Sequence, residues 1–415
     1  MKIKLSSLVI LSLLSVAQSS EAATYTWQGA STGNGQRFVR DGNWRNSADS
    51  AAGVTPTSTD TAQFNDSPTQ TTLVMNSART VLGLNFLSTA LAYSIGGSSI
   101  LTIGTGGIIN SSANSQAFSA PVAVGGIETW NAASGNLNFS GIISGSSALT
   151  LAGGAGKQIT FSGASANTFS GALAINSGQL NANKAGALGS ASSLSIASGG
   201  TFSAGAAISY ANAISGAGSV TFSGANSLTL SGNNTFSGSF GVANGGTLNA
   251  NSASALGSGS VTLTSGTMNI GANVSTPGGV SFAGGTLAVN DTAAARTASF
   301  GALALGAGST IDLTDNGTSS SLTFSSATRS AGGLTINNWV NTSSRDKIFI
   351  SSTPNAAFLL NVTFNGFGSG GQINAGGELG PAGTTPVPEP NEYAMMFGLG
   401  LFGFAIYRRR TQKRS

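Results

Sequence analysis

The chain lacks cysteine and histidine altogether, and only 7% of its 415 residues are charged. Without cysteine no disulfide can form, so stability has to come from packing and backbone hydrogen bonds. The two absences also exclude a Ser-His-Asp or Cys-His catalytic arrangement and the usual imidazole or thiolate metal sites. We therefore predict no catalytic, cofactor-binding or metal-binding residues.

The excess of basic residues, 17 Lys and Arg against 13 Asp and Glu, is confined to the two ends of the chain. Residues 23–385 carry ten basic and ten acidic side chains and are therefore neutral. A nucleic-acid groove needs clustered Lys and Arg to neutralise phosphates. The long stretch between Arg79 and Arg296 holds just four charged residues: Glu128, Lys157, Lys184 and Asp291. We expect no nucleic-acid partner.

Residues 1–22 have the form of a secretory signal peptide. A positive start at 1–4 precedes an apolar stretch at 5–16, and Ser20-Glu21-Ala22 puts small residues at positions −3 and −1 of a cut after Ala22. The alternative is a retained membrane anchor. The apolar run is short for a membrane span, which favours cleavage by signal peptidase after Ala22.

Residues 386–415 fall into three parts. The segment 386–390 is rich in proline and cannot continue a helix. Residues 393–407 carry no charge, and the basic cluster Arg408-Arg409-Arg410 follows them. As a helix, the uncharged segment would rise about 22 Å, less than a typical hydrocarbon core. The arginines should stay on the cytoplasmic side of the inner membrane. A plain C-terminal anchor is the alternative interpretation.

The order of Pro388-Glu389-Pro390, an apolar helix and Arg408–Arg410 resembles the PEP-CTERM sorting signal. That resemblance implies recognition by an exosortase, a membrane cysteine protease that removes the tail. The transmembrane helix 393–407 would then hold the chain in the inner membrane transiently, before release to the outer surface or the medium. The family occurs in Gram-negative bacteria that often make exopolysaccharide, so a polysaccharide partner is also implied.

The body of the chain contains an internal repeat. The pentapeptide NTFSG at 167–171 recurs at 234–238, and the copies end on Ala-Leu-Gly at 187–189 and 255–257. Between these marks, segments such as Leu228-Thr229-Leu230 alternate apolar and hydroxyl residues, which predicts short strands with one inward face. Gly-Gly, Ser-Gly and Asn-Gly pairs supply the tight corners.

These features predict an all-β fold, a right-handed parallel β-helix over residues 75–335. Stacked coils suit strands of modest bulk, because each coil buries its inward residues against the coils above and below. At roughly 20–25 residues per coil there would be about a dozen coils. Phe169 and Phe236 should then stack inside, while Ser170 and Ser237 face outward. The alternative is a Gly/Ser-rich chain without fixed structure, which the regular Phe and Leu placement disfavours.

Segments 159–189 and 228–257 resemble the autotransporter-associated β-strand repeat found in secreted passenger domains. The flanks, residues 23–74 and 336–385, resemble the N-terminal and C-terminal regions that such proteins carry around their repeats. The resemblance implies that both flanks cap the shaft and hide coil edges that would otherwise pair with other chains.

Two classes of function fit these observations. One is an exported structural or adhesive protein of the cell surface or matrix, associated with exopolysaccharide or other cells. The alternative is a carbohydrate-active β-helix enzyme, a lyase or glycosidase, which would need two carboxylates at a set distance. The best pair, Asp312 and Asp315, would face opposite sides of a strand. Asp346, beside Arg345 and Lys347, is expected in a solvated charge cluster.

The four tryptophans could stack on sugar rings, but packing in the core or caps is the more frequent use of tryptophan. These residues are Trp27, Trp44, Trp130 and Trp339. The acidic residues are too scattered along the chain to predict a calcium site.

Overall fold

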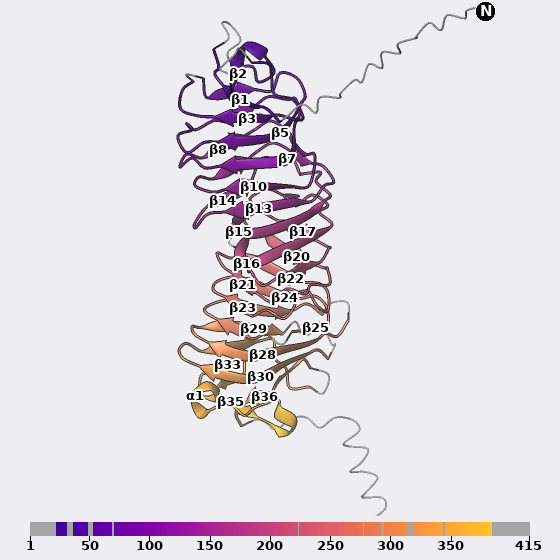
Figure 1. Ribbon diagram of the computed structural model, residues 1–415. Coiled ribbons are helices and arrows are strands. Elements are labelled where there is room, and N and C mark those ends of the chain that lie inside the picture. The colour runs from indigo at the N-terminus through magenta and orange to yellow at the C-terminus, as the bar shows by residue number, and fades with distance from the viewer. Residues whose placement is uncertain are drawn as a thin grey trace, which may run out of the picture.

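A computed structural model describes residues 22–383, with gaps at 31–35, 49–52, 69, 223, 277, 292–293, 314–318 and 343–344. The described chain is one elongated stack of strands, a parallel β-solenoid of about 13 turns (Figure 1). This confirms the expected all-β solenoid. The body of the predicted signal peptide and the whole predicted sorting signal lie outside the described residues. No helix within the described part of the chain has the length and apolarity that crossing a membrane requires.

The strands form two large sheets and one small pair. The first sheet contains β1 (Thr24–Trp27), β2 (Trp44–Asn46), β3 (Thr61–Phe64), β4 (Thr72–Val74), β5 (Arg79–Phe86), β6 (Ser94–Gly96), β7 (Leu101–Asn110), β8 (Gln116–Phe118), β9 (Val122–Val124), β10 (Glu128–Ala132), β11 (Leu137–Phe139), β12 (Ile143–Ser144), β13 (Leu149–Gly153), β14 (Gln158–Phe161), β15 (Ala172–Ala182), β16 (Ser193–Ala204), β18 (Ile214–Ser215), β19 (Ser219–Phe222), β21 (Ser239–Val242), β23 (Val261–Leu263), β25 (Val274–Ser275), β26 (Val280–Phe282), β28 (Thr297–Leu305), β30 (Ser321–Arg329) and β32 (Lys347–Ile350).

The second sheet contains β17 (Ile208–Tyr210), β20 (Ser227–Leu230), β22 (Thr247–Ala250), β24 (Thr267–Ile270), β27 (Thr286–Val289), β29 (Ser309–Leu313), β31 (Leu334–Asn337), β33 (Val362–Phe364) and β34 (Gly368–Ser369). The small pair is β35 (Gly371–Ile373) and β36 (Leu379–Pro381). One short helix, α1 (Ala356–Leu359), and two 3-10 turns (Asp41–Asn43 and Ala375–Gly377) complete the described elements.

Neighbouring coils pair in parallel and in register. Leu228 lies opposite Leu248, and Leu248 lies opposite Met268, so a coil has 20 residues in this part of the shaft. Nearer the C-terminal end, Ile336 lies opposite Phe364, a step of 28 residues. The loops therefore absorb the differences in coil length while the strands keep their register. Parallel pairing also extends outside residues 75–335, from β1 with β3 to β31 with β33.

The core fills the inside of the coils, because alternate residues of each strand point inward. Leu, Ile, Val and Phe occupy these inward positions and are almost fully buried. Phe64 stacks on Phe86 with ring centroids 4.6 Å apart, as expected for an interior ladder. Phe169 and Phe236 are 3% and 0% exposed. The serines that follow them in the repeat are exposed, so the predicted register is confirmed.

The asparagine that opens the NTFSG repeat links three coils. Asn234 is buried, accepts a hydrogen bond from the backbone N–H of Ile214 at 2.8 Å and donates one to the carbonyl of Ala255 at 2.6 Å. Asn167 makes the equivalent bonds in the first copy, to the coil before it and the coil after it. Because a buried backbone group without a partner is costly, this position needs a short side chain with both a donor and an acceptor.

The glycine that closes the repeat is required by close packing between coils. A Cβ on Gly238 would lie 1.6 Å from the carbonyl oxygen of Gly218, and a Cβ on Gly171 would lie 2.0 Å from that of Ser147. No side chain fits at these distances. Gly257 is the last residue of the Ala-Leu-Gly segment at 255–257. Its φ of 58° lies in the left-handed region that glycine adopts without strain.

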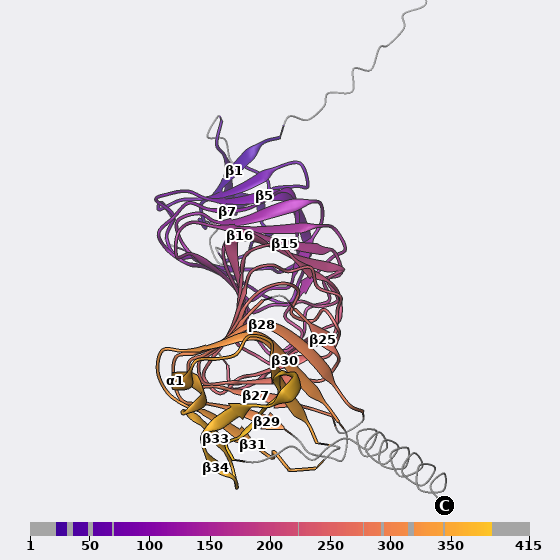
Figure 2. The ribbon, with the colours of Figure 1, turned by 90° about the horizontal axis from the view of Figure 1, so that it is seen from below.

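Antiparallel pairs and tryptophans close both ends of the stack. At the N-terminal end β1 pairs antiparallel with β2, and the rings of Trp27 and Trp44 meet edge to face at 5.1 Å. At the C-terminal end β33 pairs antiparallel with β34 (Figure 2). There β35 also pairs with β36, and Trp339 packs on Phe364. All four tryptophans are at most 4% exposed, so their expected role in packing is confirmed.

The inter-coil role of the repeat asparagine can be tested on two adjacent residues. Asn234→Ala should lower the free energy of unfolding by about 2–4 kcal/mol, because it leaves two buried backbone groups without partners. Asn233→Ala is the matched control, since Asn233 is exposed; it should change stability by less than about 0.5 kcal/mol. Denaturant unfolding followed by circular dichroism measures both, and equal effects would contradict this role for Asn234.

Candidate functional site

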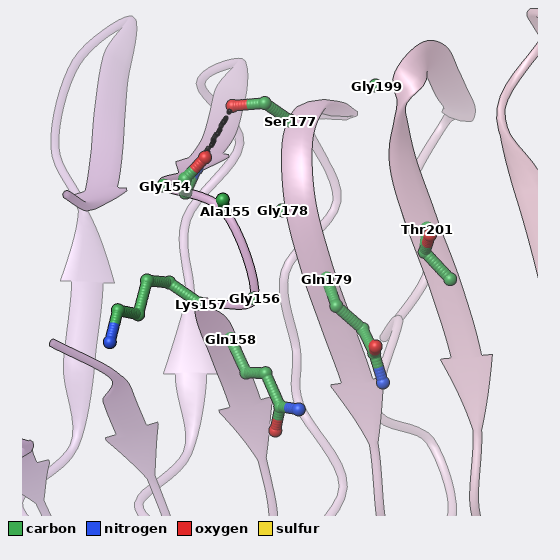
Figure 3. Close-up of a pocket in the computed structure, with 11 residues that line it drawn as sticks. Gly154, Ala155, Gly156, Lys157, Gln158, Ser177, Gly178, Gln179, Gly199 and Thr201 are labelled. Carbon is green, nitrogen blue, oxygen red and sulfur yellow. Dashed lines mark hydrogen bonds between the residues drawn. The ribbon is translucent and has the colours of Figure 1, made fainter. Parts of the chain in front are cut away.

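A hollow on the shaft lies beside a bend where three coils meet (Figure 3). It has a volume of about 400 Å³. Its walls come from the loop between β13 and β14 and from the bends of β15 and β16. The lining consists of residues 153–158 and 177–179 together with Gly199 and Thr201. We call this hollow the bend groove.

Glycines make up much of the lining of the bend groove, so few side chains fill it. Ser177 holds the loop against β15, where its Oγ donates to the carbonyl of Gly153 at 3.0 Å and accepts from the N–H of Gly153 at 3.1 Å. Beside it, a Cβ on Gly178 would lie 2.8 Å from the Cα of Gly153, so Gly178 has no room for a side chain. The pairing of β15 with β16 shifts register between Ile175 and Ser177, which marks the bend.

A network of amides borders the bend groove. Asn181 donates from Nδ2 to Oε1 of Gln158 at 2.7 Å and accepts a hydrogen bond from Nε2 of Gln179. Lys157 adds a cation, and it is the one charged side chain between Arg79 and Arg296 that is not buried. The lining therefore offers donors and acceptors for a polar, largely uncharged ligand, but its side chains include no carboxylate.

Most of the residues predicted from the two end signals lie beyond the described part of the chain. Ala22, the residue before the predicted signal-peptidase cut, is described and is exposed. The sorting motif Pro388-Glu389-Pro390 and the basic cluster Arg408–Arg410 fall outside the described residues. The cleavage and sorting assignments therefore stay predictions.

Of the two carboxylates considered as a catalytic pair, the structure describes Asp312. Asp312 faces outward on β29 and accepts a hydrogen bond from Nδ2 of Asn338 at 2.7 Å. Asp315 lies outside the described residues.

The prediction of a solvated charge cluster around Asp346 is wrong. Arg345 and Asp346 are each only 2% exposed. Arg345 pairs with Oε1 of Glu378 at 2.7 Å and lies over the ring of Trp339 at 5.5 Å. The closing segments fold over these residues and bury them, and a buried cation needs such a partner.

Sequence reasoning also missed a buried link between two distant carboxylates. Ser320 donates from Oγ to Oδ2 of Asp291 at 2.9 Å and from its backbone N–H to Oδ1 of Asp346 at 2.7 Å. Asp291 and Asp346 are 0% and 2% exposed, so a bound substrate would not reach either group. They are 55 positions apart, and no local pattern connects them. We interpret this link as structural.

Glu128 is an acidic residue inside the core, and no sequence pattern indicates its burial. Its side chain is 3% exposed, and Oε1 accepts a hydrogen bond from Nε1 of Trp130 at 3.0 Å. Burial raises the pKa of this carboxyl to about 9, so it is protonated and neutral at pH 7. Lys184 is buried too, donates to the carbonyl of Gly141 at 3.1 Å, and has its pKa lowered by burial.

Comparisons with known proteins give no relative. A scan against protein-family models, a search of curated proteins and a search of solved structures each return no match to this chain.

The buried Glu128 predicts a pH-dependent stability. Its folded-state pKa lies above the value of 4.5 that it has when unfolded, so the stability it contributes is fully present below pH 4.5. That contribution is lost as the pH rises toward about 9, because the unfolded chain ionises and the folded chain holds its proton. Glu128→Gln should flatten this part of the curve. Thermal unfolding of both proteins between pH 4 and 9 measures it, and parallel curves would contradict the assignment.

Proposed function

We propose that the chain is an exported structural or adhesive protein of the bacterial cell surface or extracellular matrix, and that it associates with exopolysaccharide. The observation that carries this proposal is the exterior of the shaft. Many of its outward strand positions hold Ser, Thr, Asn or Gln, as in the row Gln158, Gln179, Thr201, Ser219 and Ser239. Such a surface exchanges hydrogen bonds with a hydroxyl-rich polymer and has few charges to repel it.

In this proposal, signals at the two ends of the chain direct its export and its release from the inner membrane. Signal peptidase cuts after Ala22 during export, and the helix 393–407 anchors the chain transiently in the inner membrane. An exosortase then reads Pro388-Glu389-Pro390 and releases the protein to the outer surface or the medium. We also expect the coils to wind in the right-handed sense that parallel crossovers almost always take.

The bend groove is the observation that favours the alternative, a carbohydrate-active lyase or glycosidase. Its volume of about 400 Å³ suits a small sugar segment. Glycoside hydrolysis usually depends on a pair of carboxylates, whereas the lining of the groove supplies amides, two hydroxyls and one lysine. The groove therefore fits binding better than bond cleavage, and we prefer the structural or adhesive role.

Polysaccharide association can be measured directly. The full chain, purified in mild detergent, should co-sediment with the exopolysaccharide of its own host and remain bound at high salt. Salt screens exposed charges but leaves neutral hydrogen bonding largely intact. A protein that stays in the supernatant, or binds only at low salt, would refute the proposed association.

The sorting step gives a separate prediction. Replacing Pro388, Glu389 and Pro390 by Ala should leave a full-length species in the inner membrane of the native host. The proline-rich segment would then no longer present an extended strand to the protease. Wild-type protein should lose the tail beyond this motif and appear at the outer surface or in the medium. Intact mass with membrane fractionation measures both, and mature wild type that retains Arg408–Arg410 would show a plain anchor instead.

A further inference from the structure

Six threonines form one straight row on the outer face of the second sheet. The register places them directly opposite one another on β22, β24, β27, β29, β31 and β33, and all six are partly exposed. At the usual strand spacing the row is about 24 Å long. The residues are Thr247, Thr267, Thr286, Thr310, Thr335 and Thr363.

A second polar row runs beside the first, two residues farther along each strand and therefore on the same face. The two rows are about 7 Å apart. Amides dominate the second row, and Asn269 donates to Asn249 at 2.9 Å. Its members are Asn249, Asn269, Ala288, Asp312 and Asn337. We call the two rows together the threonine–asparagine face.

Strand preference alone does not account for this face. Thr is a good strand residue and Thr–Thr pairs stabilise sheets, but outward positions of the first sheet carry mixed residues. One such row runs Thr221, Gly241, Thr262, Ser281 and Ala304. Nor does simple duplication of a fixed-length unit account for it. The step between neighbouring threonines ranges from 19 residues to 28, yet every step returns a threonine to the same place.

We propose that the threonine–asparagine face binds a single extended, uncharged polysaccharide chain that lies along the shaft. The inference rests on the proposed function in taking polysaccharide as the partner, and it adds the surface and the class of sugar. Each of the six coils presents a hydroxyl, which both donates and accepts, and three of them add an amide with both capacities. An extended chain of equatorially linked pyranoses advances one sugar in a distance close to one strand spacing. Successive sugars therefore meet the same groups in successive coils.

The chemistry of the face disfavours other partners. Protein interfaces usually depend on buried aromatic or aliphatic anchors, and the two rows contain none. Nucleic acid needs cations, and the one charge in the two rows is the carboxylate of Asp312. That carboxylate also repels acidic polysaccharides. Contacts at a single coil are weak, so useful affinity has to come from many coils acting together.

The test measures binding of the full chain to cellobiose, cellotetraose and cellohexaose by isothermal titration calorimetry, with polygalacturonate as an acidic probe. Affinity should rise steeply with oligosaccharide length. The triple variant T267V/T286V/T310V keeps the β-branched shape and removes three hydroxyls. It should bind cellohexaose at least about tenfold more weakly. The matched control T160V/T221V/T262V, on the first sheet, should bind like wild type, and T267S/T286S/T310S should retain binding because it keeps the hydroxyls.

Several outcomes would overturn the inference. Equal affinity of the two valine variants would show that the sugar binds elsewhere, and exopolysaccharide association itself would still stand. Tighter binding of polygalacturonate, or no binding of any cello-oligosaccharide, would exclude a neutral extended chain as the occupant. Loss of self-association in the face variant, seen by light scattering without any change in sugar binding, would make the face a contact between copies. If the wild type bound neither the cello-oligosaccharides nor its host polysaccharide, the proposed function would be refuted too.

Discussion

The whole molecule depends on the register between parallel coils. Each coil takes its backbone hydrogen bonds and its apolar contacts from the coils above and below, so a coil is not stable on its own. The repeat NTFSG follows from this constraint. Asn234 satisfies backbone groups of two neighbouring coils, and Gly238 allows their carbonyls to approach. The inward Phe236 fills the space between them, while the serine that follows faces solvent.

A stack of this kind must end somewhere, and its ends carry the unusual interactions. An open coil would expose unpaired N–H and C=O groups and invite pairing with other chains. At the N-terminal end an antiparallel strand and the Trp27–Trp44 contact cover the first coil. At the C-terminal end the covering segments bury the Arg345–Glu378 ion pair. Breaking one partner of such a pair leaves an uncompensated buried charge, so the cap is held in one arrangement.

The solenoid could be predicted from the sequence because its signals are local. Alternating segments such as Leu228–Leu230 and the NTFSG copies indicate which residues face inward, and the structure has Phe236 buried and Ser237 exposed as expected. Contacts between distant coils could not be predicted in the same way. The link from Asp291 through Ser320 to Asp346 depends on which coils are neighbours, and coil lengths vary too much for spacing to reveal that. The threonine row was hidden for the same reason.

A stack of coils also determines what kind of binding such a protein achieves. A compact enzyme brings a few groups from distant parts of the chain to one point, and those groups leave short motifs. A solenoid repeats one modest contact along its length, so no single residue of the threonine–asparagine face need be distinctive. Affinity then grows with the number of coils that a ligand spans. A polymer that itself repeats at the strand spacing gains from this arrangement, whereas a small molecule does not. The low charge of the shaft therefore suits the proposed role, the binding of a long neutral chain.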